Sequence, residues 1–563
     1  MGSVMQVPFS FFLPKFSLAF GGFRNVHEYI LGASRFETVL SLGDPMNLKY
    51  SLGFLALGAA FGLSACGGDS ASAADDTPVT DPYLSNGIVY SEAQDPFLSS
   101  SSDFFYSSAE APVYSSEAYG TISSSSVTAL LSSSSVTSVV TSSASDGFVA
   151  GATGGTTSGV FPTTADASLP PSLYTTWKDF HYITLEDEAS RYPTWGAEFG
   201  EVFGSYTAQG LKAARIIWST FNSASCQITE ASGSNMYKRG CTVSEGIGYG
   251  MLITLFEGDL DAYNRLWIYS KAYRNTPYAS GRGLMPWLTS SFSWDIPDDA
   301  SATDADLDIA TSLILAYYKT SKQEYLTDAL TLISALWEHE VNKSNYLLYS
   351  GDTPGTWQGA DPTYNLSYFS PVALRLFALV DPSHDWKAVL DAQYTYMKKV
   401  QDAGTGVFPD WSNGEGVAVN PPNNSGTTTY WTFNKESVRI PWRIAWDYYW
   451  FSDERAAEVL NTLNQFIVEK SSGDPSQIPA VNYSWNLSVG DDITGQSLPV
   501  QWLAAWCATG MGGNSPEWLN SCTTLLNSKA MQTSASSYFP NILQMMYSQL
   551  LNGFYTKPSN MGI

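Results

Sequence analysis

Hydrophobic and polar positions follow a helical period over the C-terminal two thirds of the chain. From about residue 173 to residue 557, apolar residues recur at spacings of three and four. In the run DIATSLILAYY, for example, Ile309, Leu313, Ile314 and Tyr317 form one face. The pattern predicts twelve helices and shows no convincing run of alternating strands. The helices are expected near 196–220, 247–257, 260–274, 304–320, 323–341, 367–379, 383–401, 438–452, 453–469, 497–509, 515–530 and 537–551.

The ends of these helices carry the expected signals. Asp304 precedes one helix, Pro382 and Ser383 precede another, and Pro516 suits a first turn. Three of the connecting loops are long, at 275–303, 343–366 and 402–435, and long loops in a compact domain usually carry function. We therefore expect an all-α catalytic domain over 173–557, with paired helices in a ring and a groove at one end.

The first 172 residues have a different character. Residues 46–66 (MNLKYSLGFLALGAAFGLSAC) resemble a signal peptide with a short apolar core, and LSAC resembles a lipobox whose Cys66 would be lipidated. The residue directly after Cys66 is Gly67 and not aspartate, which favours the outer membrane or cell surface. Residues 1–45 are then an upstream extension of the gene, or else part of an unusually long leader. Residues 67–172 are rich in serine runs and are expected to form a disordered tether.

Charge and composition limit the classes of molecule that the chain is expected to bind. The net charge of −25 argues against binding to nucleic acid or to anionic membrane surfaces, and leaves a lipid anchor on Cys66 as the membrane contact. Aromatic residues make up 14% of the chain, and Tyr and Trp rings suit stacking on sugars. The four histidines are scattered and no metal-binding, nucleotide-binding or serine-hydrolase motif occurs. We expect no metal, no cofactor and a monomer.

The remaining cysteines fall into two local pairs, each separated by fifteen positions. Pairing of Cys226 with Cys241 and of Cys507 with Cys522 closes the smallest loops. A disulfide across a loop of that size contributes about 3 kcal/mol. Four free buried thiols are the alternative.

Three segments place carboxylates at helix starts. They are TVSEGIGYGM with Glu245, SATDADLDIA with Asp304, and NKESVRIPWR with Glu436 three residues before Arg439. Each has a structural alternative, namely a helix cap or a salt-bridged helix start. A glycosidase needs one carboxyl to protonate the leaving oxygen, and an inverting one needs a second carboxylate to activate water. Glycines around Glu245 would let a polysaccharide chain lie close to the backbone.

In this order, SEGIGYGM, ATDADLDIA and ESVRIPWR resemble the motifs of glycoside hydrolase family 8, as do NLSYFSP (365–371) and VFPDWSN (407–413). The resemblance spans about 180–555. It implies an (α/α)6 barrel of twelve helices and inverting hydrolysis of β-1,4-linked glucan, xylan or chitosan. Glu245 would be the general acid, Asp304 would stabilise the distorted sugar, and Asp306 would lie behind it. The expected substrate-binding residues are Tyr249, Asp306, Trp287, Tyr368, Trp411 and Arg439.

One position departs from the family pattern. The family's largest group has aspartate where this chain has Glu436, and the extra methylene moves the carboxylate by roughly 1 Å. Glu436 is the first candidate for the general base, and Asp410 and Glu415 are the alternatives from the preceding loop.

The leading hypothesis is therefore an exported endo-β-1,4-glycanase that acts on cellulose or mixed-linkage glucan first and xylan second. A reducing-end oligoxylanase, a chitosanase, another (α/α) enzyme, or a carbohydrate-binding surface protein that lost its base are the alternatives.

Overall fold

The structure is a computed structural model that describes residues 161–191, 196–218, 240–277, 279, 281–292, 296–422, 428–486, 491–493, 497–534 and 536–562. The expected extension at 1–45, the signal peptide with Cys66, and the tether as far as residue 160 lie outside these residues, as does Cys226. Within the described residues there are fourteen α-helices and seven strands of two to four residues.

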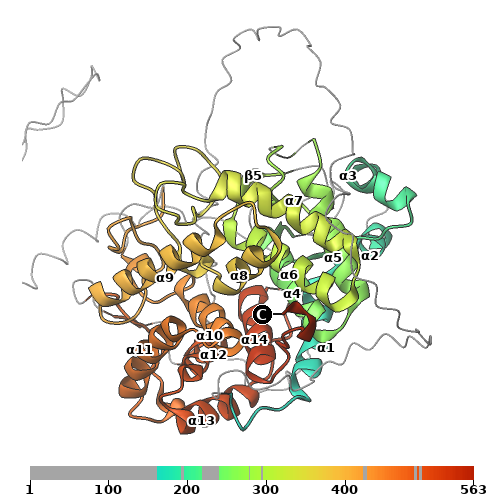
Figure 1. Cartoon of the computed structure of the whole chain (residues 1–563). Helices are drawn as coiled ribbons and strands as arrows, with labels where there is room; N and C mark the ends of the chain where they lie inside the picture. Colours follow the sequence, from blue (N-terminus) through green and yellow to red (C-terminus); the bar gives the residue numbers. More distant parts are fainter. Residues whose placement is uncertain are drawn as a thin grey trace, which may run out of the picture. The chain divides into compact units, whose positions relative to one another are not determined.

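Six helices form a closed inner ring, because each packs against the next and the last packs against the first. They are α4 (Ser244–Glu257), α6 (Thr303–Thr320), α8 (Pro371–Val380), α10 (Ile440–Phe451), α12 (Val500–Thr509) and α14 (Tyr538–Leu551). Almost every residue of α4 and α14 is buried. An inner ring of this kind is the core of the barrel, and Figure 1 shows its helices in sequence order around the centre.

Each inner helix is backed by an outer partner. The partners are α5 (Leu260–Arg274), α7 (Gln323–Glu340), α9 (Trp386–Ala403), α11 (Glu454–Lys470), α13 (Pro516–Asn527) and α1 (Leu169–His181), and α1 packs on α14. The outer helices are amphipathic: in α11, for instance, the buried residues lie at intervals of three and four. The twelve helices form the expected (α/α)6 barrel. Helices α2 (Leu185–Arg191) and α3 (Gly196–Ala208) are additional.

Two helix predictions were wrong at the start of the barrel. The helix expected over 196–220 ends at Ala208, because Gly210 has a left-handed backbone (φ 75°) and the chain then enters a strand. The first barrel helix is instead α1, which begins at Leu169. The preceding segment is already packed on the barrel, since Phe161 contacts the ring of Tyr449. The fold therefore begins before residue 173.

Short strands accompany the helices, although the hydrophobic pattern showed no convincing run of alternating strands. The strands are β1 (Tyr182–Thr184), β2 (Ala214–Ile216), β3 (Thr242–Val243), β4 (Pro286–Thr289), β5 (Asp298–Ser301), β6 (Val481–Asn482) and β7 (Asp492–Ile493). All their pairings are antiparallel, and β3, β4 and β5 form one sheet in that order. This sheet links the chain before α4 to the chain before α6, so it joins the first two acid motifs.

The glycines beside Glu245 serve helix packing. A Cβ on Gly248 would lie 3.1 Å from the carbonyl oxygen of Ala305 and 3.0 Å from Cβ of Asp308, both on α6. A Cβ on Gly250 would lie 2.9 Å from the Ile216 side chain. These positions face neighbouring elements, so the expectation that they clear space for a polysaccharide was wrong.

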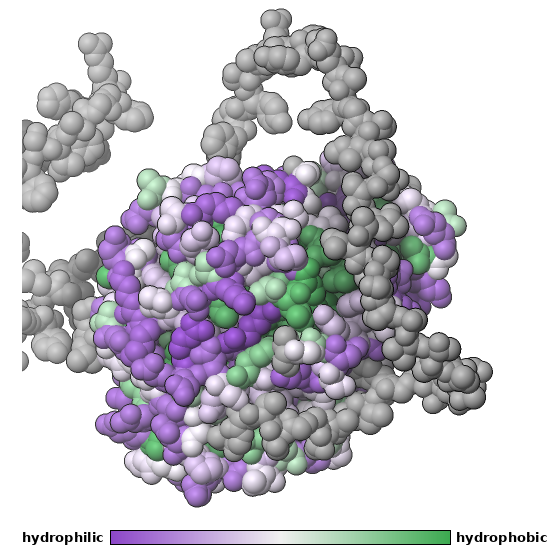
Figure 2. Space-filling view, viewed as in Figure 1, coloured by the Kyte–Doolittle hydropathy of each residue, from purple (hydrophilic) through white to green (hydrophobic). Residues whose placement is uncertain are grey.

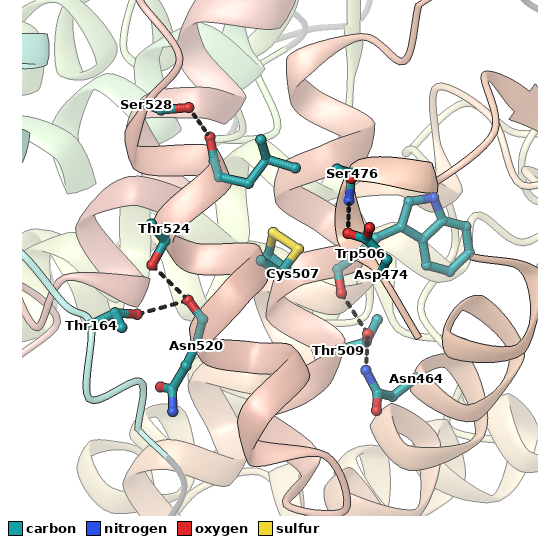
Figure 3. Close-up of a disulfide and its surroundings, with 12 residues drawn as sticks. Thr164, Asn464, Asp474, Ser476, Trp506, Cys507, Thr509, Asn520, Thr524 and Ser528 are labelled. Carbon is teal, nitrogen blue, oxygen red and sulfur yellow. Dashed lines mark hydrogen bonds between the residues drawn. A yellow bond between two sulfur atoms is a disulfide. The ribbon is translucent and has the colours of Figure 1, made fainter. Parts of the chain in front are cut away.

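A disulfide joins two neighbouring helices of the barrel. Cys507 on α12 is bonded to Cys522 on α13, as one of the two local pairings predicts (Figure 3). Thr164 of the segment before α1 donates to the carbonyl oxygen of Asn520 beside it (2.9 Å). Cys241 is also disulfide-bonded, and its partner lies outside the described residues.

The surface agrees with the strong net charge. The face seen in Figure 2 is mostly hydrophilic, with one hollowed patch of hydrophobic residues near α5 and α6. Among the helices described, none has both the length and the apolar content that crossing a membrane requires.

Candidate active site

Four inner helices begin at the same end of the barrel, and each brings a polar side chain there. Glu245 lies in the first turn of α4, Asp304 in the first turn of α6, and Tyr538 is the first residue of α14. Glu436 precedes the short 3-10 helix η6 (Ser437–Arg439), which runs into α10. Helix N-termini carry partial positive charge, so this end of the barrel favours ionised carboxylates.

One guanidinium connects the three acid motifs. Nη1 of Arg439 donates to Oε2 of Glu245 and lies 3.5 Å from Oδ2 of Asp304. Nη2 of the same side chain donates to Oε2 of Glu436. The arginine is buried, with 5% of its side chain exposed, whereas Glu245 and Glu436 retain 16% and 17%. The two candidate catalytic carboxylates are therefore the groups that solvent, and a substrate, can reach.

Burial raises the pKa of Glu245 above its ordinary value. Arg439 and the hydroxyl of Tyr538, which donates to Oε1 of Glu245 (2.7 Å), act in the opposite direction. Burial also holds the pKa of Asp304 well above its usual range, although Arg439 lowers it. A carboxyl group with a raised pKa can carry a proton near neutral pH, which a general acid must do.

Glu436 has one occupied and one open oxygen. Oε2 accepts from Arg439 and also from Nδ2 of Asn365, at 2.6 Å. Among the described residues, nothing donates a hydrogen bond to Oε1. An open oxygen on a partly exposed carboxylate is free to accept a proton from water.

The two alternative bases occupy different positions. Asp410 is buried, and its Oδ1 accepts hydrogen bonds from the segment that carries Glu436. Burial and the nearby Glu436 raise the pKa of Asp410 to about 8. Glu415 is exposed in a turn held by Asn413, and no contact joins it to Arg439 or to Glu245 within the described part of the chain. The structure therefore brings Asp410 to the site and leaves Glu415 outside it.

A buried ion pair lies directly below Arg439. Arg443, one turn later on α10, donates from Nη1 and Nη2 to the two carboxylate oxygens of Asp308 on α6, at 2.8 and 2.9 Å. Its Nε donates to the carbonyl oxygen of Ser367. This pair holds α6, α10 and the loop before α8 together under the acids.

The two expected substrate-binding tyrosines are both buried, and they lie at different distances from the carboxylates. Tyr368 lies beside the carboxylates, with the guanidinium of Arg439 5.5 Å from its ring centre. Tyr249 is fully buried one turn below Glu245, where it packs edge-on against Trp442. Tyr249 therefore supports the site from beneath, and the expectation that it binds substrate directly was wrong.

The two tryptophans expected to stack on sugars are also buried. Trp411 is fully enclosed, because Trp357 from the loop before α8 stacks on it with ring centres 5.2 Å apart. Trp287 lies in strand β4, with 3% of its surface exposed. Neither offers an exposed ring face, so both contribute to packing around the groove and the stacking prediction was wrong for them.

Asp306 lies behind Asp304, as expected, and does not face the groove. Its Oδ1 accepts from the backbone N–H of Met285 at 3.1 Å. Burial raises its pKa to about 8. Its other oxygen is buried with no hydrogen-bond partner in the described residues, as is Oε2 of Glu340 on α7. Burial first, and then the charge of Asp306, hold the pKa of Glu340 well above its usual range, so these two carboxyls form a buried pair that favours protonation.

Sequence reasoning missed Tyr538, Asn365 and Arg443. Tyr538 starts the last helix and carries no motif, so nothing in the sequence links it to a glutamate 293 positions away. Asn365 and Arg443 lie inside the segments NLSYFSP and RIPWR, which were noticed for other residues. No group of three or more His, Cys, Asp or Glu side chains in the described ranges could hold a metal ion.

Comparisons with known proteins agree with this geometry. The family described as "Glycosyl hydrolases family 8" matches residues 218–551, more than half of the chain. The chain is 29% identical over 347 residues to endoglucanase 2 of Ruminiclostridium josui, and the matched region covers 58% of this chain and 68% of that protein. It is 30% identical over 360 residues to the beta-glucanase of Niallia circulans, covering 60% and 83%.

The fold is also similar to a solved structure. The apo beta-1,3-1,4-glucanase from Paenibacillus sp. X4 superposes with a TM-score of 0.56 at 25% identity, covering 71% of this chain and 96% of that one.

Proposed function

The chain belongs to glycosyl hydrolase family 8, and we propose that it cleaves internal β-1,4 bonds of cellulose or mixed-linkage β-glucan with inversion of the anomeric carbon. The observation that carries this proposal is the arrangement around Arg439. One guanidinium holds two partly exposed carboxylates from different helices, one with a raised pKa and one with an open oxygen. A pair of this kind suits an acid and a base.

In the proposed reaction, Glu245 gives its proton to the glycosidic oxygen as the bond to the anomeric carbon breaks. Oε1 of Glu436 takes a proton from a water molecule whose oxygen attacks the same carbon from the opposite face. Asp304 and Arg439 stabilise the charge that develops on the sugar and on the two carboxyls. At the end Glu245 is ionised and Glu436 is protonated, and exchange with solvent restores both.

The names of the relatives support glucan as the substrate. Three of the matched proteins are named endoglucanase, beta-glucanase and beta-1,3-1,4-glucanase, and a relative of lower identity (23%) is named a reducing-end xylose-releasing exo-oligoxylanase. We therefore place glucan before xylan and chitosan.

An activity panel tests the proposal. The purified protein is incubated with carboxymethylcellulose, mixed-linkage glucan, xylan and chitosan, and released reducing ends and the anomeric configuration of the products are measured. We expect the highest rate on a glucan, with α-configured products. Glu245→Gln should lower kcat by at least about 1,000-fold. Glu415→Gln, at the exposed turn, is the matched control and should keep full activity. Binding of glucan without turnover would instead favour a carbohydrate-binding surface protein.

We also propose that the chain is an exported lipoprotein of the outer membrane or cell surface and acts as a monomer. The support is the signal-like segment that ends at Cys66 and the serine-rich tether that follows. In a bacterial host, Cys66→Ala should move the protein from the membrane fraction to the soluble fraction. Light scattering of the barrel in solution should give the mass of one chain.

A further inference from the structure

We propose that Asp410 is a positioning residue that fixes the general base from another loop, by capping the turn that carries Glu436. The inference deepens the proposed function and rests on it, because it assigns a role to Asp410 within that reaction.

Four donors converge on one oxygen of Asp410. Its Oδ1 accepts from the backbone N–H groups of Asn434 (3.2 Å), Glu436 (3.1 Å) and Ser437 (3.0 Å), and from the hydroxyl of Ser437 (2.9 Å). These groups lie at the start of η6, which runs into α10, and the N–H of Asn434 also donates to the hydroxyl of Ser437 (2.8 Å). The side chain of the N-cap residue normally caps the start of a helix. Here the N-cap residue of η6 is Glu436, and its side chain makes no cap hydrogen bond. Asp410 therefore supplies this cap from 26 positions earlier.

The loop that holds Asp410 is itself fixed. The backbone N–H of Asp410 donates to the carbonyl oxygen of Tyr430 at 2.9 Å, and the side chain is buried. Its neighbour Trp411 is enclosed by Trp357. The carboxylate is thus a rigid point to which the turn with Glu436 is attached.

The position of this turn decides the position of two groups in the site. Glu436 sits at the turn, and Arg439 closes η6 only three residues later. Catalytic geometry is sensitive to displacements of about 1 Å, which cost up to roughly 100-fold in rate. A longer glutamate at the base position needs a firmly held backbone, and Asp410 provides that hold.

The competing role for Asp410 is that of the base itself. Its Oδ2 accepts no hydrogen bond in the described residues, so chemistry through that oxygen is the alternative to test. The two roles predict different effects of an added anion on a variant that lacks the Asp410 carboxylate. Azide is an anionic nucleophile that enters the space left when the base carboxylate is deleted, so it restores turnover in a variant that lacks the base. In Asp410→Ala the Glu436 carboxylate is still present, and its volume and negative charge exclude azide if Glu436 is the base.

The test compares Asp410→Asn, Asp410→Ala and Glu436→Ala on mixed-linkage glucan and on an aryl cellooligoside, with and without azide. Asparagine keeps an acceptor oxygen for the turn, so we expect its kcat to stay within about five-fold of the parent. Alanine should lower kcat about 100-fold with KM nearly unchanged, and azide should not restore it. Azide should restore turnover in Glu436→Ala. Azide rescue of Asp410→Ala, or equal losses in both Asp410 variants, would overturn the proposal.

Two further measurements keep the inference independent of activity and of folding failure. Amide exchange at Asn434, Glu436 and Ser437 should be at least about ten-fold faster in Asp410→Ala than in Asp410→Asn. If the exchange rates are unchanged, the cap is refuted, whatever the activity of the chain. If the chain is inactive on every glycan, that result refutes only the proposed function. If Asp410→Ala does not fold, Ser437→Ala takes its place, because it removes one of the four donors. Its kcat should fall, but by less than the loss of about 100-fold expected for Asp410→Ala.

The matched control for the cap is Asp385→Ala. Asp385 is an exposed cap on α9 whose carboxylate accepts from the N–H of Ala388 at 3.0 Å. Its loss removes the same kind of interaction from a helix outside the site, so activity should stay within about two-fold. A loss as large as that of Asp410→Ala would show that the effect is general destabilisation.

Discussion

Replacing Asp308 by alanine should destabilise the barrel more than any surface substitution. Asp308 and Arg443 are both buried, with at most 1% of either side chain exposed, and two hydrogen bonds of 2.8 and 2.9 Å join them. Without the carboxylate, the guanidinium stays buried beside the ring of Trp442 and, among the described residues, keeps the Ser367 carbonyl as its hydrogen-bond partner. Breaking a buried pair in this way costs about 3–5 kcal/mol.

This loss of stability should appear as a measurable fall in the melting temperature. A domain of roughly 400 residues unfolds with about 2.1 cal/mol/K per residue, or about 0.8 kcal/mol/K in total. The loss should therefore lower Tm by about 4–6 °C in differential scanning calorimetry. Because Arg443 lies one turn below Arg439, kcat on glucan should fall as well.

Two controls separate this effect from a general loss of charge. Lys398 and Asp402 form an exposed pair one turn apart on α9, so Asp402→Asn should change stability by less than about 0.5 kcal/mol. Replacing both buried partners, as Asp308→Leu with Arg443→Met, removes the unpaired charge and should recover most of the lost stability. A Tm shift below about 1 °C for Asp308→Ala would refute the reasoning.

Three further outcomes follow from the site and the barrel. The Tyr538 hydroxyl lowers the pKa of Glu245, so Tyr538→Phe should move the alkaline limb of the kcat/KM profile to higher pH; an unmoved limb would contradict the assignment of the acid. Burial raises the pKa of Asp306 from 3.8 to about 8, so its protonated form stabilises the fold at low pH, and this contribution is lost as pH rises through that range. Asp306→Asn should flatten the fall of Tm between about pH 5 and pH 8, and an equally steep fall would contradict it. Replacing Cys507 and Cys522 by serine opens a loop of 15 residues and should cost about 3 kcal/mol in urea unfolding, whereas an unchanged midpoint would count against it.

Much of the barrel could be predicted because its helices are long and regularly patterned. Eleven of the twelve barrel helices correspond to predicted segments, and the acid motifs lie at their starts. The first barrel helix was missed because its boundary was drawn from composition. Leu173 and Trp177 of α1 have helical spacing, but they follow directly on a serine-rich region. Strands of two to four residues, such as β4 with all four residues buried, are too short to show an alternating pattern.

The site was predictable to the extent that motifs carried it. Glu245, Asp304, Glu436 and Arg439 are brought together as the resemblance implies. The exposure of the aromatic side chains was not predictable, because it depends on which loop folds over which ring. The loop with Trp357 covers Trp411, and neither sequence segment indicates that contact. The link from Asp410 to Glu436 was missed for a related reason, since a carboxylate that caps a distant turn has no spacing signature.

The segment before α1 packs on one end of the barrel. Phe161 packs on Tyr449 near the last turn of α10, and the backbone of Asp166 donates to Asn552 just after α14. Both helices begin at the carboxylates, so these contacts lie at the far end of the barrel. The described chain therefore joins the barrel at the end opposite Glu245, Asp304 and Glu436, so its first contacts and the carboxylates are separated by the length of the inner helices.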